Sequence, residues 1–259
     1  IDLTGTLQLG VTARDVFHHI VRVLGPRGCR GHVLELGGDT IDNMSLEGRQ
    51  SITCLAMFTG AITAVINPDK KALAYIKDRA RIVIDPLFSD SDAKYASRHE
   101  IDVSALEPIV VVPPSPADTR DISEVAGTEV HVGYLGSCAS GRVEDLELAA
   151  DVLEGHKVKA GFQLNVIPTS QEIMKIAAEK GIITRLINAG AFISSSSCDY
   201  CFGRIGVMRA GQRAVSTGTL NVRGRMGSPD SEIYIVNAAA VAAAAIEGRI
   251  TDPRPYLKR

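Results

Sequence analysis

The residues of this chain best suited to chemistry are three cysteines in two short loops. Cys138 lies in a stretch of small residues at 136–142, and Cys198 and Cys201 form a Cys-x-x-Cys pair. Thiolates at such spacings hold iron–sulfur clusters or zinc, because a Cys-x-x-Cys turn lets two sulfurs bind one site. Three cysteine ligands where a structural site has four would leave one metal position open for chemistry.

The Cys-x-x-Cys spacing is also that of a redox dithiol, a structural disulfide or half of a zinc site. A thioredoxin-like pair would lie on a strand-to-helix turn early in a βαβ unit, whereas this pair follows the serines at 194–197. The chain has five cysteines and no secretory signal, which disfavours a disulfide framework. Spacing alone leaves a metal or cluster site and a buried or redox pair equally open.

The sequence around the cysteines resembles the aconitase family, which includes the large subunits of 3-isopropylmalate dehydratases. Four motifs carry the resemblance. The first combines Gly-His-Val-Leu-Glu at 31–35 with Met-Ser-Leu-Glu-Gly-Arg at 44–49, and the second begins with Gly-Ser-Cys at 136–138 and continues to Leu146. The third is the loop 198–203, and the fourth combines Gly-Arg-Met-Gly-Ser-Pro at 224–229 with the segment 238–253. They occur in the family's order, and the resemblance extends over nearly the whole chain.

This resemblance implies that Cys138, Cys198 and Cys201 each bind one iron of a [4Fe–4S] cluster. The fourth iron would carry no cysteine and would act as a Lewis acid on the substrate's hydroxyl and carboxylate. The implied enzyme is a hydro-lyase or isomerase that removes and re-adds water on a small hydroxy di- or tricarboxylate. Arg225 falls on one of the family's two substrate-clamping arginines, whose guanidinium binds a carboxylate through two hydrogen bonds. The sequence assigns no catalytic residue.

Several positions depart from the family pattern. The segment that normally reads Asn-Arg-Asn-Phe has Thr219 and Leu220 in place of its first asparagine and its arginine, the other clamp. In the helix near residues 45–59, Cys54 and Phe58 replace an asparagine and a glutamate that face the cluster. Residues 139–140 are Ala-Ser where the family usually has Thr-Asn. Polar groups have thus become apolar or smaller.

Two hypotheses follow from these departures. In the first, the chain keeps the cluster and acts on a less polar or differently shaped substrate, with Leu220 and Phe58 lining a pocket for an apolar group. In the second, the chain is a non-catalytic or cluster-carrying paralogue that has lost the hydratase reaction. The thiol of Cys54 would close the open position if it bound the fourth iron, although free cysteine also serves as a small apolar residue. Cys29 has no motif around it.

Other polar residues carry weaker signals. Arg142 and Arg223 are cations near these loops, and either could pair with a neighbouring acid. Glu35 follows a buried strand, so a structural role and a supporting role at the site are both open. The remaining candidates are histidines in helix or strand patterns, where a packed or exposed side chain is expected rather than a catalytic one: His18, His19 and His32.

Hydrophobic periodicity predicts an α/β fold, with two α/β/α domains of the aconitase type and largely parallel sheets. Domain boundaries are placed at 1–103 and 104–259, with a polar interdomain connection over 90–102. Helices are expected near 12–24, 45–59, 69–79, 143–153, 169–180 and 238–246, and strands near 32–36, 62–66, 109–112, 131–135, 163–167 and 233–236.

Composition limits the function classes. The chain has 259 residues, a net charge of −2 and 45% hydrophobic residues, so nothing electrostatic favours nucleic acid or an anionic membrane. Its longest apolar run is far shorter than the ~20 residues of a membrane span. No export signal opens the chain, and we expect a cytoplasmic protein.

The resemblance also implies missing parts. The chain starts at Ile1 where the family's second domain starts. We therefore expect partners: the family's first domain, and the small swivelling domain that covers the cluster. They would belong either to a longer polypeptide or to separate chains.

Overall fold

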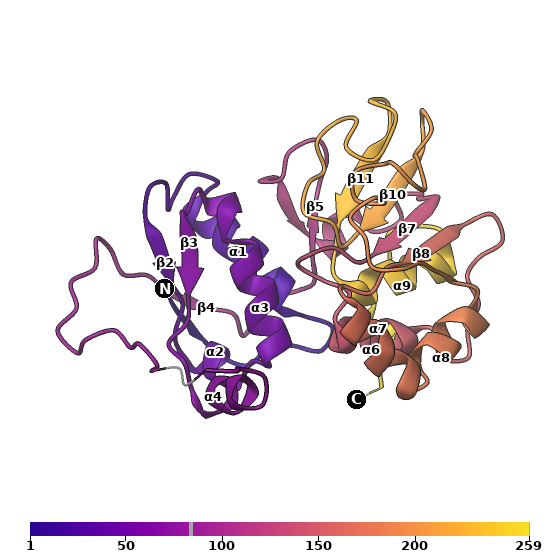
Figure 1. Cartoon of the computed structure of the whole chain (residues 1–259). Coiled ribbons are helices and arrows are strands. Elements are labelled where there is room, and N and C mark those ends of the chain that lie inside the picture. The colour runs from indigo at the N-terminus through magenta and orange to yellow at the C-terminus, as the bar shows by residue number, and fades with distance from the viewer. Residues whose placement is uncertain (83–84, 259) are drawn as a thin grey trace.

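The chain folds into two lobes, which a computed structural model describes for residues 1–82 and 85–258 (Figure 1). The first lobe contains β1 (Asp2–Thr4), α1 (Ala13–Leu24), β2 (Val33–Glu35), α2 (Asp39–Asn43), α3 (Leu46–Cys54), the 3-10 helix η1 (Ala56–Thr59), β3 (Thr63–Val65), α4 (Lys70–Lys77) and β4 (Glu100–Asp102). Strands β1 and β4 pair in parallel, as do β2 and β3, and an Asp2–Gly37 bridge joins the pairs. Phe17, Ile20 and Ile52 are fully buried in the core of this lobe.

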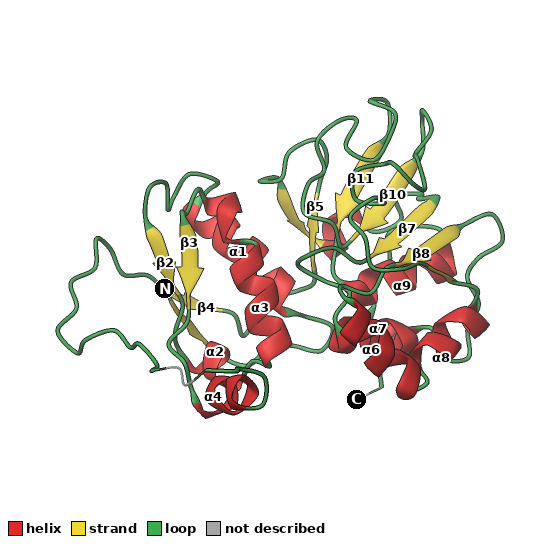
Figure 2. Ribbon diagram, viewed as in Figure 1, coloured by secondary structure: helices red, strands yellow, loops and turns green. Residues whose placement is uncertain are grey.

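The second lobe is built on a seven-stranded sheet with the order β6-β5-β11-β10-β7-β8-β9. Its elements are β5 (Ile109–Val111), β6 (Thr119–Asp121), α5 (Ile122–Val125), β7 (Val132–Leu135), α6 (Val143–Val152), β8 (Gln163–Val166), α7 (Gln171–Glu179), α8 (Ile182–Ala189), β9 (Phe192–Ile193), β10 (Arg213–Ser216), β11 (Glu232–Ile235), α9 (Ala238–Glu247) and the 3-10 helix η2 (Arg254–Tyr256). Strands β11, β10, β7, β8 and β9 are parallel. Beside β11, strand β5 pairs antiparallel with it, and the outermost strand β6 pairs antiparallel with β5. Figure 2 shows α6, α7, α8 and α9 below this sheet. The predicted α/β class with largely parallel sheets is confirmed.

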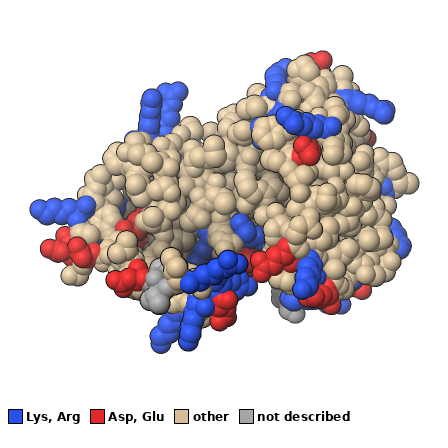
Figure 3. All heavy atoms as spheres, viewed as in Figure 1, with Lys and Arg blue, Asp and Glu red and all other residues tan. Residues whose placement is uncertain are grey.

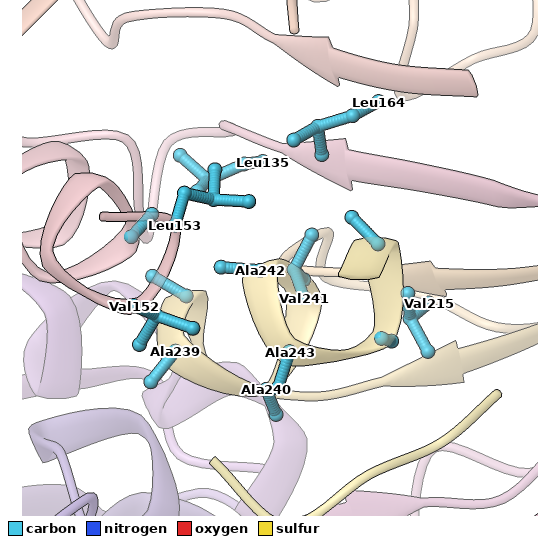
Figure 4. Close-up of a cluster of buried hydrophobic side chains, with 14 of the residues drawn as sticks. Leu135, Val152, Leu153, Leu164, Val215, Ala239, Ala240, Val241, Ala242 and Ala243 are labelled. Carbon is cyan, nitrogen blue, oxygen red and sulfur yellow. The ribbon is translucent and has the colours of Figure 1, made fainter. Parts of the chain in front are cut away.

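The two faces of this sheet have different partners. Side chains such as Leu135 and Val215 belong to one apolar cluster with helices α6 to α9. Helix α9 can pack closely because its alanines present little bulk, and Figure 4 shows Val241 and Ala242 beside Leu135. The alternate residues, Tyr134 among them, face a second cluster formed with the loops after β9 and β10. This alternation is the period of two expected of a strand.

Helix caps explain most of the confirmed helix boundaries. Asp15 Oδ2 accepts a hydrogen bond from the backbone N–H of Thr12, and Gly25 ends α1 at a φ of 78°. Ser45 caps α3, and Asn237 caps α9 by accepting from the N–H of Ala240. Side-chain oxygens at such positions satisfy N–H groups that have no partner inside the helix.

Two predicted segments differ from the structure. The helix expected over 45–59 is α3 followed by η1, because Thr53 Oγ1 bonds back to the carbonyl of Arg49 and the chain tightens before Gly60. The connection expected over 90–102 is partly wrong, because its last residues form β4 beside β1. The division at 103/104 stays a proposal, since Leu106 and Ile109 still belong to the first lobe's core. No helix in the described part of the chain is long and apolar enough to span a membrane.

Candidate functional site

The predicted site residues all follow parallel strands at one edge of the seven-stranded sheet. Cys138 follows β7, Cys198 and Cys201 follow β9, and Arg225 lies in the long loop after β10. These strands run parallel, so their carboxyl ends meet at the same edge. Ligand sites of open α/β sheets lie at this edge. The fold therefore brings together residues that are up to 87 positions apart in sequence, as 225 − 138 = 87.

Thr217 fixes the loop that carries Cys138. Its Oγ1 accepts a hydrogen bond from the N–H of Gly136 at 2.8 Å and donates one to the carbonyl of the same residue at 2.7 Å. Ser137 donates its hydroxyl to the Thr217 carbonyl at 2.9 Å and adopts a φ of 102°. A non-glycine residue rarely takes this left-handed conformation, so the loop geometry is imposed by the bonds around it.

The three cysteines lie close enough to influence each other's ionisation. Burial raises the pKa of the Cys138 thiol, and the charges of Cys54 and Cys201 raise it further. Burial likewise raises the pKa of Cys198, helped by Cys201 and Cys138. A redox-active or nucleophilic cysteine needs a lowered pKa. Burial does not activate these thiols, and it does not separate a redox pair from a set of metal ligands, because a metal also binds the thiolate.

The cysteine site fits a cluster better than a single ion. Within the described ranges, no three His, Cys, Asp or Glu side chains converge as ligands of one metal ion. A [4Fe–4S] cluster does not require its ligands to converge on one point, because each cysteine binds a different iron. Gly218 borders the Cys201 sulfur, since a Cβ there would lie 3.9 Å from that sulfur and only 2.9 Å from Ser216 Oγ, so a larger residue would crowd the loop. Sulfur-only donors in these loops match iron–sulfur ligation.

Arg225 lies directly against the Cys201 side of the site. Its Nη2 donates to the Cys201 sulfur at 3.5 Å, and its guanidinium carbon lies 3.8 Å from the centre of the Phe202 ring. Its buried Nε has no hydrogen-bond partner in the described part of the chain. Among the ion pairs of residues 1–82 and 85–258, none involves Arg225. An oriented guanidinium without a carboxylate partner is suited to bind the carboxylate of a ligand.

Arg14 is a functional candidate that the sequence analysis missed. It lies on α1 at 4% exposure and donates to the carbonyls of Thr217 at 2.6 Å and Gly218 at 3.0 Å. Burial lowers its pKa, while the charges of Asp145, Asp15, Cys138 and Cys201 oppose that shift. A positive charge is thereby held beside the cysteines. The one sequence signal was a charged pair, Arg14-Asp15, inside the apolar stripe of a helix.

Asp15 joins the two lobes. Its carboxylate accepts hydrogen bonds from Asn237 Nδ2 at 2.8 Å and from the N–H of Ile109 at 2.8 Å, and it is fully buried. Burial raises its pKa against the lowering effect of these bonds. Arg14 and Asp15 thus hold α1 against the sheet that carries the cysteines.

The residues that depart from the family pattern lie where the two lobes meet. Phe58 and Ala139 are buried in the first lobe's core, and the half-buried Leu220 packs against it. The prediction that Phe58 lines a pocket is not supported, because only 8% of its surface is exposed. Cys54 is exposed, and its charge acts on Cys138.

The weaker candidates fall outside the site or beside it. Glu35 accepts bonds from Asn67, Ser89 and Tyr95, so it ties a surface loop to β2. Arg142 donates to the Cys138 carbonyl at 3.2 Å. The remaining predictions are confirmed as packed or exposed side chains: buried His18, half-buried His19 and exposed His32. Figure 3 shows charged residues mostly along the lower edge and outer rim of this view.

Comparisons with known proteins agree with this geometry. A sequence model of the aconitase family (aconitate hydratase) matches residues 1–129 and 123–248. The chain belongs to the aconitase family. Among its relatives, "3-isopropylmalate dehydratase large subunit 1" of Methanopyrus kandleri is 40% identical over 258 residues, covering 99% of this chain and 62% of the relative. The protein of the same name from Pyrococcus abyssi is 40% identical over 257 residues, covering 98% and 61%.

A third relative, "3-isopropylmalate dehydratase large subunit" of Heliobacterium modesticaldum, is 39% identical over 251 residues, covering 96% of this chain and 60% of its own length. This aconitase-family chain therefore spans about 60% of the length of the relatives it matches.

His18 should make the stability of the protein depend on pH. Burial, with a smaller effect of Arg14, lowers its pKa to about 3, and neither ring nitrogen has a hydrogen-bond partner among the residues that the structure describes. Between about pH 3 and 6.5 only the unfolded chain binds this proton, so stability falls as the pH drops, by about 1.4 kcal/mol per pH unit. We expect the free energy of unfolding, measured by urea denaturation, to fall by about 2 kcal/mol less in His18→Leu than in wild type between pH 7 and pH 5. The exposed His32→Leu is the control. A wild-type-minus-His18→Leu difference that does not change with pH would contradict this assignment.

Proposed function

We propose that this chain is the cluster-bearing part of an iron–sulfur hydro-lyase or isomerase that acts on a small hydroxy carboxylic acid. The observation that carries the proposal is the meeting of three cysteines with the unpaired guanidinium of Arg225 at one sheet edge. Relatives named as 3-isopropylmalate dehydratase large subunits support the reaction type. Further domains or partner chains would complete the enzyme, because those relatives are longer.

Cys138, Cys198 and Cys201 would hold a [4Fe–4S] cluster. When bound, such a cluster supplies a Lewis-acid iron that stabilises the charge on a departing hydroxyl. Arg225 would bind a substrate carboxylate, with Phe202 holding the guanidinium plane by a cation–π contact. Arg14 would hold the loop at Thr217 and Gly218 in place through its two carbonyl contacts. Its buried positive charge would also favour the ionised cysteines.

The substrate would be less polar than the usual one of the family. Leu220 stands where the second clamping arginine is expected, and it packs against the first lobe's core. One guanidinium clamp then remains, and an apolar side chain lies where a charged substrate group would otherwise be bound. A ligand with an apolar group on that side fits this arrangement.

Leu220→Arg alone is expected not to produce ordinary 3-isopropylmalate turnover. The new guanidinium would face an apolar cluster and lose hydration without gaining a partner, while Cys54 and Phe58 would remain unchanged. Formation of the unsaturated acid, followed by its ultraviolet absorbance in the cluster-loaded complex, measures the result. Turnover at the level of an ordinary family member would show that Leu220 alone sets the difference.

The alternative is a non-catalytic, cluster-carrying paralogue. The observation that favours it is the effect of the Cys54 charge on the pKa of Cys138, because a fourth thiolate would close the position a substrate needs. Oxygen exchange separates the two functions. The loaded complex is incubated in ¹⁸O-labelled water with 3-isopropylmalate and with hydroxy acids of decreasing polarity, using Cys198→Ser as the blank. Label in the recovered hydroxy acid supports the hydro-lyase, and its absence from every acid supports the paralogue.

A further inference from the structure

Tyr134, on the central strand β7, carries a buried hydroxyl without a partner. Its side chain is 0% exposed, and its Oη makes no hydrogen bond to any described residue. An unpaired buried hydroxyl costs about 1–3 kcal/mol, so a native protein seldom keeps one without a reason. Phenylalanine would fill the same space in an apolar cluster at no such cost.

The hydroxyl lies under the loops that carry the cysteines. A Cβ added to Gly136 would come within 3.2 Å of Oη, which places the hydroxyl beneath the loop of Cys138. The Tyr134 ring stacks on Tyr200, with centroids 6.3 Å apart and an angle of 18° between the rings. Tyr200 is the residue before Cys201, and both belong to the apolar cluster that contains Tyr134.

The charged surroundings fit a hydrogen-bond donor. Burial raises the pKa of Tyr134, and the charges of Cys201, Cys198 and Cys138 raise it further. The phenol therefore keeps its proton and is available as a hydrogen-bond donor. Among the described residues, this donor has no acceptor.

We propose that the Tyr134 hydroxyl donates a hydrogen bond to a sulfur of the bound cluster or of its Cys201 ligand. This inference rests on the proposed cluster. Tyr134 is then a positioning residue that tunes the cluster, because it contacts sulfur and takes no part in proton removal. A hydrogen bond to sulfur stabilises the electron-rich, reduced cluster and so raises its reduction potential.

Tyr134→Phe tests the inference while preserving the ring. We expect the oxidised-to-reduced equilibrium of the cluster to shift about tenfold toward the oxidised form, a midpoint lower by about 59 mV for one electron. Iron and sulfide per chain should stay at the wild-type level. Anaerobic redox titration followed by EPR measures the midpoint in the complex with its partner chains.

Tyr234→Phe is the matched control. Tyr234 lies on β11 of the same sheet but faces the opposite cluster, against the helices. Removing its hydroxyl should leave the midpoint unchanged. A second variant, Tyr134→Gln, keeps a donor group at the site and should return the midpoint toward wild type, which a purely structural role would not produce.

The outcomes separate this inference from the function it rests on. A loaded Tyr134→Phe protein with an unchanged midpoint overturns the hydrogen bond and leaves the proposed function standing. A Tyr134→Gln midpoint no closer to wild type than that of Tyr134→Phe also overturns it. A wild-type protein that takes up no cluster after reconstitution overturns the proposed function, and this inference with it.

Discussion

Replacing Cys198 by serine is expected to remove the proposed iron–sulfur cluster and, with it, the proposed hydro-lyase turnover. Serine is a poor ligand for iron compared with thiolate, and only two of the three cysteines, Cys138 and Cys201, would remain. Iron per chain should fall from about four to below about one after anaerobic reconstitution. Iron and acid-labile sulfide analysis measures the loss, and absence of unsaturated acid confirms it.

Cys29→Ser is the matched control for this change. Cys29 is free and buried in the first lobe's core, and its carbonyl accepts a bond from the N–H of His32 whichever side chain is present. The substitution should cost some stability but leave iron and sulfide at the wild-type level. Full iron and sulfide in Cys198→Ser would contradict the assignment of Cys198 as a ligand.

Arg225→Lys is expected to lower kcat/KM about 100-fold, equivalent to about 2.7 kcal/mol. Lysine keeps the positive charge but loses the planar fork that binds a carboxylate through two hydrogen bonds. It also loses the stacking of the guanidinium on Phe202. Steady-state kinetics of the cluster-loaded complex, at equal iron content, measures the effect.

The control for Arg225 is its exposed neighbour Arg223. Arg223 makes no ion pair with the described residues, and it lies two positions away in the same loop. Arg223→Lys should change kcat/KM less than about threefold. A fully loaded Arg225→Lys enzyme with wild-type kcat/KM would show that the guanidinium stabilises the loop and does not bind the substrate.

Local signals were sufficient for much of the fold. Ser45, Asp69 and Ser170 each cap a helix where the sequence placed one, by accepting a backbone N–H three residues on. Helix α8 is absent from the sequence-based prediction, because a glycine directly after the helix expected near 169–180 usually signals a helix end. In the structure Gly181, at a φ of 75°, ends one helix and begins the next. Strand β10 was missed because four residues with a polar first position, Arg213–Ser216, give no clear alternation.

The site was predictable only in part. The cysteines and Arg225 came from motif resemblance, and the parallel sheet explains why they meet at one edge. Arg14 was not predictable, because its partners are carbonyls more than 200 positions away, as 217 − 14 = 203. Tyr134 reads as an ordinary strand residue, and its missing acceptor shows only in three dimensions. Such features depend on tertiary contacts, which local sequence patterns do not encode.

The proposed function depends above all on three cysteines holding a cluster whose fourth iron has no protein ligand. The measurement is iron and sulfide content with EPR, on protein purified anaerobically together with its partner chains. We predict a [4Fe–4S] cluster that becomes [3Fe–4S] on mild oxidation, because the iron without a cysteine is lost first. A cluster that resists this loss would contradict the open site and point to Cys54 as a fourth ligand. No iron after reconstitution would contradict the enzyme itself.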